Sequence, residues 1–337
     1  MDKKSADLIP PGLAYLADNI TSKGNLLGAS KATGARWAKG LNFSKEAETI
    51  FFAGCGYQYA SGLESLMSLI RRIDKSAVST ELTMSLAGFQ KKLGVDAAGI
   101  YRRFMARGND SDAQPLRDAV RVLDNLGVKF SYLGQEEPCC GGLLYYIGLR
   151  EEFAKHAQDV HDQLKSRGVR RIISMVPSCT NTLRNLIPDS IEEHELEVKH
   201  FCEVVAENIS SLELRFPREV KVTYHDPCQL VRYLELVEEP RKILRAIKGI
   251  ELVEPEWTSG EWATCCGGGG GFEAVFPELS QILAVNRARE LVETGAEIIV
   301  THCPGCIMQL QSGLKELKTS GVEVLDLTQI VAMAMEK

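Results

Sequence analysis

The chain has 337 residues, of which 45% are hydrophobic and 25% charged, so it is long enough for one large or two medium domains, each with its own core. Its net charge of −6 and its scattered lysines and arginines provide no basic face for nucleic acid. No apolar run reaches the length of a membrane span, and the N-terminal MDKKSADLIPPG lacks the apolar core of a signal peptide, so we expect a cytoplasmic protein.

An N-terminal arm, residues 1–47, comes first in the chain. It contains the Pro10-Pro11 break, the short amphipathic stretch LAYLADNI and the basic residues Lys31, Arg36 and Lys39. Because it has few long apolar runs, it would make a poor independent core, and we expect it to dock on a partner protein. The alternative is that it packs over the chain's own sheet.

Apolar strands and amphipathic helices alternate through the rest of the chain. We predict helices that include 150–167 and 278–294, and strands at about 49–53, 128–132, 171–176, 220–224, 250–253 and 297–301. This alternation is typical of an α/β fold with open, mainly parallel sheets and helices on both faces. Residues 60–114 have helical periodicity but no counterpart later in the chain, which indicates a surface insertion.

Comparison of the chain with itself reveals a repeat. The segments ETIFFAGCGYQYASG and VKVTYHDPCQLVRYL share the order strand, turn, cysteine and helix, and each half also contains a CCGG element. Further on, GVRRIISMVPSC and GAEIIVTHCPGC align without a gap. We therefore predict a tandem duplication of a Rossmann-like unit, with the first copy at residues 48–195 and the second at residues 196–337.

The cysteines follow this repeat. The reducing cytosol keeps most thiols free, so we expect ligands or redox groups rather than disulfides. The second half has a set of five, and the first half a set of four because Val176 stands where the second half has Cys303. The sets are Cys228, Cys265, Cys266, Cys303 and Cys306, and Cys55, Cys139, Cys140 and Cys179. Cys202, in the apolar stretch KHFCEVVAENI, is more typical of a buried helix residue.

The placement of these thiols indicates metal chemistry. Ligands of open parallel sheets bind beyond the carboxyl ends of the strands, where cysteines distant in sequence should meet. Thiolate groups of this kind select iron–sulfur centres, zinc or copper(I). Five thiolates exceed the four that tetrahedral zinc or a simple four-iron cube requires.

Several neighbouring residues are further candidates. Glycine lets backbone approach a cluster closely, and Gly267 and Gly268 in TCCGGGGGF are placed to do so; a phosphate loop is the alternative, although no G-x-G-x-x-G context surrounds them. His225 and His302 adjoin the cysteine motifs and are weak candidates for a proton donor or ligand, against the plainer role of bonding to backbone. Glu136 and Glu137 indicate a solvated turn.

The elements FFAGC, EEPCCGG, YHDPC, TCCGGGG and HCPGC resemble the CCG domain, the duplicated cysteine-rich domain found in the B-type and D-type proteins of heterodisulfide reductase and in the iron–sulfur subunits of glycolate oxidase and anaerobic glycerol-3-phosphate dehydrogenase. The resemblance covers about residues 48–330. It implies a non-cubane 4Fe-4S cluster on the five-cysteine set and leaves room for a second iron–sulfur cluster on the four-cysteine set. It also implies an oxidoreductase subunit that reduces or oxidises a disulfide or thiol substrate.

Two other functions stay open. One is a pure electron-transfer subunit between a flavoprotein dehydrogenase and a carrier or quinone, and a weaker one is a zinc-binding or dithiol protein. The chain has no flavin motif and no C-x-x-C-x-x-C-x-x-x-C run, so we expect electrons to come from a ferredoxin-like iron–sulfur subunit or a flavoprotein subunit. Any association with a membrane would then pass through such a partner.

Overall fold

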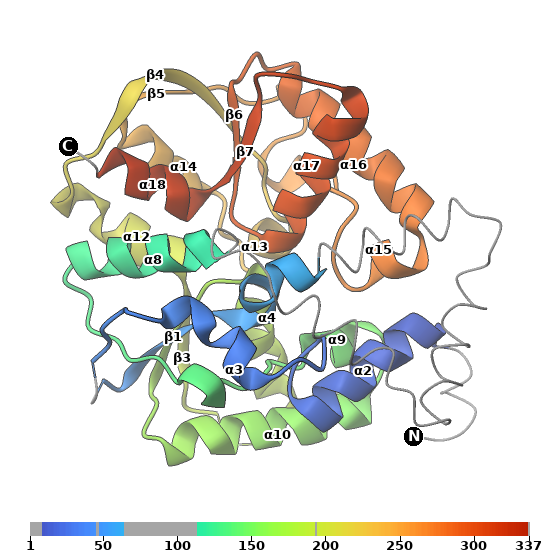
Figure 1. Ribbon diagram of the computed structural model, residues 1–337. Coiled ribbons are helices and arrows are strands. Elements are labelled where there is room, and N and C mark those ends of the chain that lie inside the picture. The colour runs from blue at the N-terminus through green and yellow to red at the C-terminus, as the bar shows by residue number, and fades with distance from the viewer. Residues whose placement is uncertain (1–8, 45–46, 64–112, 193, 336–337) are drawn as a thin grey trace.

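The two halves of the chain form two parallel sheets that lie one above the other in the computed structural model (Figure 1). The structure describes residues 9–44, 47–63, 113–192 and 194–335. The insertion expected at about 60–114 lies almost entirely outside these residues. Within them, no helix is both long enough and apolar enough to cross a membrane.

The elements of the arm and the first half precede residue 212. The arm contains α2 (Pro11–Lys23), α3 (Lys31–Gly34) and the 3₁₀ turn η1 (Arg36–Ala38). The first half contains β1 (Thr49–Phe52), α4 (Gly54–Gln58), α8 (Gln114–Asn125), η3 (Gly134–Glu136), α9 (Gly142–Tyr146), α10 (Arg150–Ser166), β2 (Arg171–Ser174), α11 (Pro177–Asn181), a π-helical turn η4 (Thr182–Leu186), η5 (Pro188–Ser190), β3 (Glu197–His200), α12 (Phe201–Asn208) and η6 (Ile209–Ser211).

The second half repeats this order of strands and helices. It contains β4 (Arg215–Tyr224), α13 (Cys228–Tyr233), α14 (Glu238–Arg245), β5 (Lys248–Leu252), η7 (Gly260–Trp262), α15 (Phe272–Val275), α16 (Pro277–Val292), β6 (Ile298–Thr301), α17 (Pro304–Leu317), β7 (Glu323–Asp326) and α18 (Leu327–Ala334).

Both sheets have the same topology. The first has the order β1-β2-β3, with a parallel bridge from Ile50 to Ser131 on the outer side of β1, and the second has the order β5-β4-β6-β7. All strand pairs are parallel. This shared arrangement confirms the predicted α/β fold and the tandem duplication.

The last strand of each sheet, β3 and β7, was not among the predicted strands. Each is four residues long and mixes charged with apolar residues, as in Glu197–His200 and Glu323–Asp326, so neither has a strong strand pattern. Since β3 pairs with β2, the first sheet continues past residue 195, where the sequence suggested that the first copy ends.

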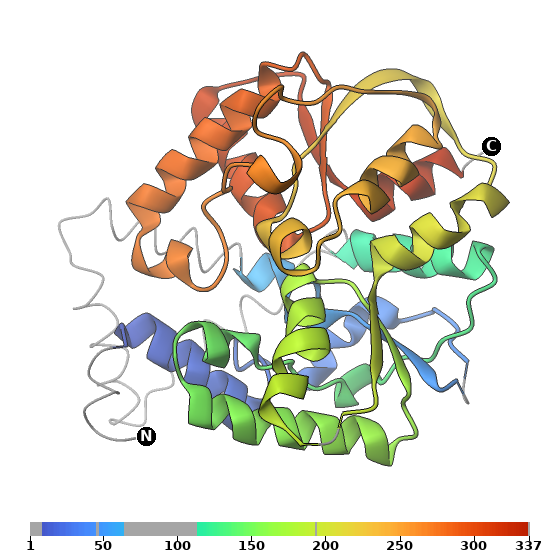
Figure 2. The same cartoon turned by 180° about the vertical axis from the view of Figure 1, so that it is seen from behind.

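Four helices lie between the two sheets and join the halves. Helix α8 of the first half packs on α18 of the second, and α14 of the second half packs on α12 of the first. Figures 1 and 2 show this layer from opposite sides, with α10 on the far side of the first half. Buried apolar residues of both halves, such as Leu123, Phe201 and Ile243, belong to one continuous core. The halves are therefore not separate globules.

The carboxyl ends of the strands in the two sheets face each other across this junction. Helix α11 contacts α13, and α17 contacts α4, so the helices that follow equivalent strands meet in reciprocal pairs. The Tyr57 hydroxyl donates a hydrogen bond to Asp326, and the rings of His200 and His302 lie 4.9 Å apart between centroids. The edges that the sequence assigns to ligand binding therefore lie side by side.

The described part of the arm packs against this core. Leu13, Leu16 and Ile20 of α2 are buried, and the ring of Trp37 lies among aromatic rings that include Phe51. The Arg117 guanidinium of α8 donates to the Trp37 carbonyl oxygen over 2.6 Å. The expectation that the arm is a docking segment for a partner is wrong for residues 9–44, because their apolar side chains are already covered by the chain's own fold.

We expect Trp37→Ala to lower the free energy of unfolding by about 3–5 kcal/mol, since it removes a buried indole and its 2.9 Å hydrogen bond to the Tyr132 hydroxyl. The matched control is Trp257→Ala, because that side chain is 79% exposed and its loss should change stability by no more than about 0.5 kcal/mol. Urea unfolding monitored by circular dichroism measures both variants. Equal effects of the two would contradict the packing of the arm.

Candidate metal centres

The five cysteines of the second half meet at the carboxyl edge of its sheet. Cys228 begins α13 just after β4, while Cys303 and Cys306 lie at the start of α17 just after β6. The loop that precedes α15 brings Cys265 and Cys266 to the same place, where the sulfurs of Cys266 and Cys306 are 3.3 Å apart. None of the ten cysteines, all of which lie in the described ranges, forms a disulfide.

The electrostatics confirm that these thiols are close. Hydrogen bonding to Cys265 and then to Cys306 lowers the pKa of the Cys266 thiol well below its ordinary value. Burial raises the pKa of Cys228 to about 11, with the neighbouring Cys303 and Cys266 acting in the same direction. Thiols that perturb one another in this way are near enough to share a metal centre.

The sulfurs differ in their access to solvent. Cys266 and Cys306 are buried, Cys228 and Cys303 are half-buried, and Cys265 is exposed. A group held by this set would therefore be open to solvent on the side of Cys265 and enclosed by the protein on the other side.

The glycine run is needed for packing as well as for approach to the sulfurs. Gly267 has a φ of +84°, and a Cβ there would clash with the carbonyl oxygen of Ser280 in α16. Its backbone N–H donates to the Cys265 sulfur over 3.3 Å, while its carbonyl oxygen accepts from the Ser280 hydroxyl. A Cβ on Gly268 would lie 2.8 Å from Cγ of Gln309 in α17. Only glycine lets this loop lie between two helices and the thiols.

The four cysteines of the first half form an equivalent set. The sulfurs of Cys140 and Cys179 are 3.3 Å apart, like their counterparts Cys266 and Cys306. Hydrogen bonding to Cys140 and then to Cys55 raises the pKa of Cys139, which places Cys55 beside the pair. All four thiols that the sequence assigned to this site therefore meet.

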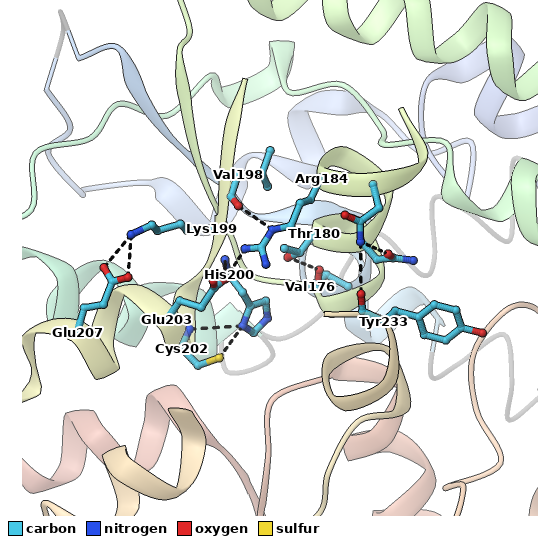
Figure 3. Close-up of polar contacts among 12 residues, drawn as sticks. Val176, Thr180, Arg184, Val198, Lys199, His200, Cys202, Glu203, Glu207 and Tyr233 are labelled. Carbon is cyan, nitrogen blue, oxygen red and sulfur yellow. Dashed lines mark hydrogen bonds and ion pairs between the residues drawn. The ribbon is translucent and has the colours of Figure 1, made fainter. Parts of the chain in front are cut away.

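Val176 occupies the position of the missing fifth thiol. Strands β2 and β6 are equivalent, so Val176 and Cys303 each stand two residues beyond the end of their strand. Val176 is buried, and a Cβ added to Gly54 would lie 2.8 Å from its Cγ2. In Figure 3 its carbonyl oxygen accepts from the Thr180 hydroxyl of α11, as in an ordinary first helical turn. The first site thus has an apolar group where the second has a sulfur.

Glu137 is a residue whose role the sequence did not reveal. Glu136 is exposed and pairs with Arg167, as expected for a turn, whereas Glu137 is buried. The Glu137 carboxylate accepts the backbone N–H groups of Ala53 and Gly54, which precede Cys55. Burial raises its pKa to about 8, although these two hydrogen bonds act in the opposite direction. The expected solvated turn is wrong for Glu137, which fixes the loop that carries Cys55.

The two candidate histidines of the second half are buried and held by side chains. His302 Nδ1 lies 2.9 Å from Asp326 Oδ1, and Asp326 also receives the Tyr57 hydroxyl. His225 Nδ1 accepts from Arg287 Nε over 3.0 Å. Its ring, together with Cys266 and Cys306, makes up a group whose ligand atoms lie within 4.8 Å of one another. Arg287 lies on α16 in a helical pattern that gave no signal of its role.

Cys202 lies apart from both sets, as expected. It is fully buried in α12, and Figure 3 shows its sulfur 3.0 Å from His200 Nδ1. His200 caps the start of this helix, and burial, followed by the effect of His302, lowers its pKa.

Comparison with known proteins agrees with this arrangement. Two segments, residues 105–184 and 222–311, match the CCG family of cysteine-rich domains and together cover about half of the chain. The first segment includes Cys139, Cys140 and Cys179 but begins after Cys55, and the second includes all five cysteines of its set.

Similar proteins include several redox proteins. The chain is 35% identical over 224 residues to the D-type protein of the dihydromethanophenazine:CoB–CoM heterodisulfide reductase of Methanosarcina mazei, a match that covers 64% of this chain and 54% of the relative. It is 33% identical to the EtfAB:quinone oxidoreductase of Syntrophomonas wolfei, over 64% of this chain and 31% of the relative. For the B-type protein of the fumarate reductase (CoM/CoB) of Methanothermobacter marburgensis the identity is 30%, over 58% and 38%.

The match thus spans about half or less of each of these relatives. Among solved structures, a hypothetical protein from Helicobacter pylori is similar, with a TM-score of 0.50 and 16% identity over 66% of this chain and 46% of the other; this likeness concerns the fold alone. Since the family matches both halves on the segments that carry the cysteine pairs, the chain belongs to the CCG cysteine-rich domain family and contains that domain twice.

Proposed function

We propose that this protein is an iron–sulfur oxidoreductase subunit, similar to the catalytic subunit of heterodisulfide reductase. It would hold a non-cubane 4Fe-4S cluster on Cys228, Cys265, Cys266, Cys303 and Cys306 and interconvert a disulfide and its thiols within a multi-subunit complex. The observation that carries the proposal is the convergence of these five thiols from three separate segments at one sheet edge. The resemblance to the D-type protein of a heterodisulfide reductase supports it.

The donor set fits such a group. It consists of soft thiolates, which iron–sulfur clusters require, and one backbone N–H already donates to the sulfur of Cys265. The set has one sulfur more than tetrahedral zinc would use. The buried sulfurs of Cys266 and Cys306 would anchor the group from within, while the exposed Cys265 lies where a substrate or partner can approach.

The chemistry requires electrons from another protein. Reduction of a disulfide consumes two electrons and two protons and yields two thiols. A bound cluster would supply electrons one at a time and an iron able to bind sulfur. We propose that a ferredoxin-like iron–sulfur subunit or a flavoprotein delivers them, in the cytoplasm, since relatives of the chain are named as subunits of larger enzymes.

A relay without substrate chemistry is the second candidate function. It is favoured by Val176, which leaves the first site with four thiols and makes the two sites unequal. In this alternative the chain passes electrons between a flavoprotein and a carrier or quinone, and its 33% identity to an EtfAB:quinone oxidoreductase supports this alternative.

The protein purified without oxygen should contain iron and acid-labile sulfide, on the order of four of each for every filled site. Iron and sulfide analysis, with zinc measured in parallel, checks this expectation. Protein produced with sufficient iron that contained zinc and no sulfide would reject the cluster in favour of a zinc site.

Substitution of Cys265 or Cys266 by serine should alter the electron paramagnetic resonance signal of the second site, because a hard hydroxyl would replace a thiolate ligand. Cys202→Ser is the matched control, since Cys202 is a buried cysteine of the same chain that contacts His200 and not the cysteine sets. A signal altered only in the Cys202 variant would reverse the assignment.

Addition of a small thiol or disulfide to the oxidised protein distinguishes the two functions. A substrate sulfur that binds at the second site should change the visible and paramagnetic spectra of the wild type, and Cys265→Ser should weaken the change. Spectra that remain the same over a panel of thiols and disulfides would favour the relay.

A further inference from the structure

Arg287 and His225 form a buried pair behind the thiols of the second site. Both side chains are fully buried, and Arg287 Nε donates to His225 Nδ1 over 3.0 Å. The first half has no such pair: Phe52 stands at the position of His225 and Val160 at that of Arg287 in the alignment of the two halves. The pair is thus specific to the half with five cysteines.

The arginine determines which nitrogen of the histidine carries a proton. A guanidinium N–H only donates, because arginine stays protonated in proteins, so His225 Nδ1 must accept with its lone pair. In a neutral imidazole the other nitrogen, Nε2, then carries the hydrogen. That nitrogen is buried and has no hydrogen-bond partner among the described residues.

The thiols are the acceptors within reach. A ring nitrogen of His225 lies within 4.8 Å of the sulfurs of both Cys266 and Cys306. Hydrogen bonding from His225 also contributes to the lowered pKa of Cys266, after the larger effects of Cys265 and Cys306. Stabilisation of a thiolate requires an N–H, and Nδ1 has none, so the donor has to be Nε2–H.

We infer that Arg287 is a positioning residue which holds His225 as an N–H donor to the sulfurs of Cys266 and Cys306, so that His225 tunes the centre and is not one of its ligands. This inference rests on the proposed cluster. Hydrogen bonds to cluster sulfurs favour the reduced, more negative state, so the pair raises the reduction potential of the second cluster.

Arg287 has a second contact that an experiment must separate from the first. Its Nη1 donates to Glu290 over 2.8 Å, and Glu290 accepts the hydroxyl of Thr264, the residue before Cys265. Loss of Arg287 could therefore act through this loop. Glu290→Gln leaves the contact between Arg287 and His225 in place and removes a negative charge, which should not lower the potential.

The experiment is a redox titration, monitored by paramagnetic resonance, of wild type, Arg287→Met, His225→Leu, His225→Gln and Glu290→Gln. We expect Arg287→Met and His225→Leu to lower the midpoint potential of the second cluster with iron and sulfide retained. We expect His225→Gln, whose amide still donates an N–H, to lower it less, and Glu290→Gln not to lower it. Unchanged potentials in Arg287→Met and His225→Leu would overturn the inference.

Labelling of histidine with ¹⁵N tests the wild type, without dependence on how the variants fold. Pulsed paramagnetic resonance should show a weakly coupled histidine nitrogen at the reduced cluster, and this nitrogen should be lost in His225→Gln. The strong coupling of a directly bound nitrogen, with iron lost from that variant, would make His225 a ligand and reject the inference.

A protein that contains no cluster would refute the proposed function, and the same labelled sample would still test the tautomer. In that case nuclear magnetic resonance should show His225 protonated at Nε2 in the wild type, with this preference lost in Arg287→Met. Protonation at Nδ1 would overturn the role of Arg287.

Discussion

Parallel strand pairing decides where the thiols of this protein lie. In each sheet the strands run in the same direction, so the segments that follow β4 and β6 leave the sheet at the same edge, only one strand apart. Cys228 and Cys303 are then placed by backbone hydrogen bonds before any metal is considered. Cys303 and Cys306 also lie at the start of the long helix α17, where the partial positive charge of the helix favours thiolates.

The junction between the halves depends on the same edges. Asp326, the last residue of β7, caps α18 through the Thr328 N–H and binds both His302, which precedes Cys303, and Tyr57, which follows Cys55. Burial raises the pKa of Asp326, but the opposing effect of His302 is larger in sum with its other partners, and the net pKa is lowered. One carboxylate thus connects the loops of the two cysteine sets, which explains why the halves pack as one body rather than as two linked domains.

The sequence was sufficient for features that repeat or that have a strong period. The duplication, six segments of parallel strand, the long helices α10 and α16 and the membership of the cysteine sets could all be predicted, because each leaves a local pattern. Strands β3 and β7 could not, since four mixed residues have too little periodicity. The packing of Trp37 and the burial of Glu137 depend on partners that are far away in the chain, such as Tyr132 and Ala53, and no local pattern encodes them.

The two halves keep one sulfur geometry but surround it with different charges. The distance of 3.3 Å between the innermost sulfurs is the same in both, yet the first half has a buried carboxyl group, Glu137, and the second has a buried guanidinium, Arg287. The half with the cation also has the additional thiol, Cys303. Two unit charges about 4 Å apart interact by about 4 kcal/mol at an effective dielectric constant near 20, so a fifth thiolate costs much less beside a cation than beside a carboxylate. In the first half Val176 avoids that repulsion, and the buried carboxyl group can serve the backbone of the Cys55 loop instead. The loss of one thiol and the gain of one carboxyl group are thus compatible changes in a single site, and they allow the two copies to differ in redox properties without a change of fold.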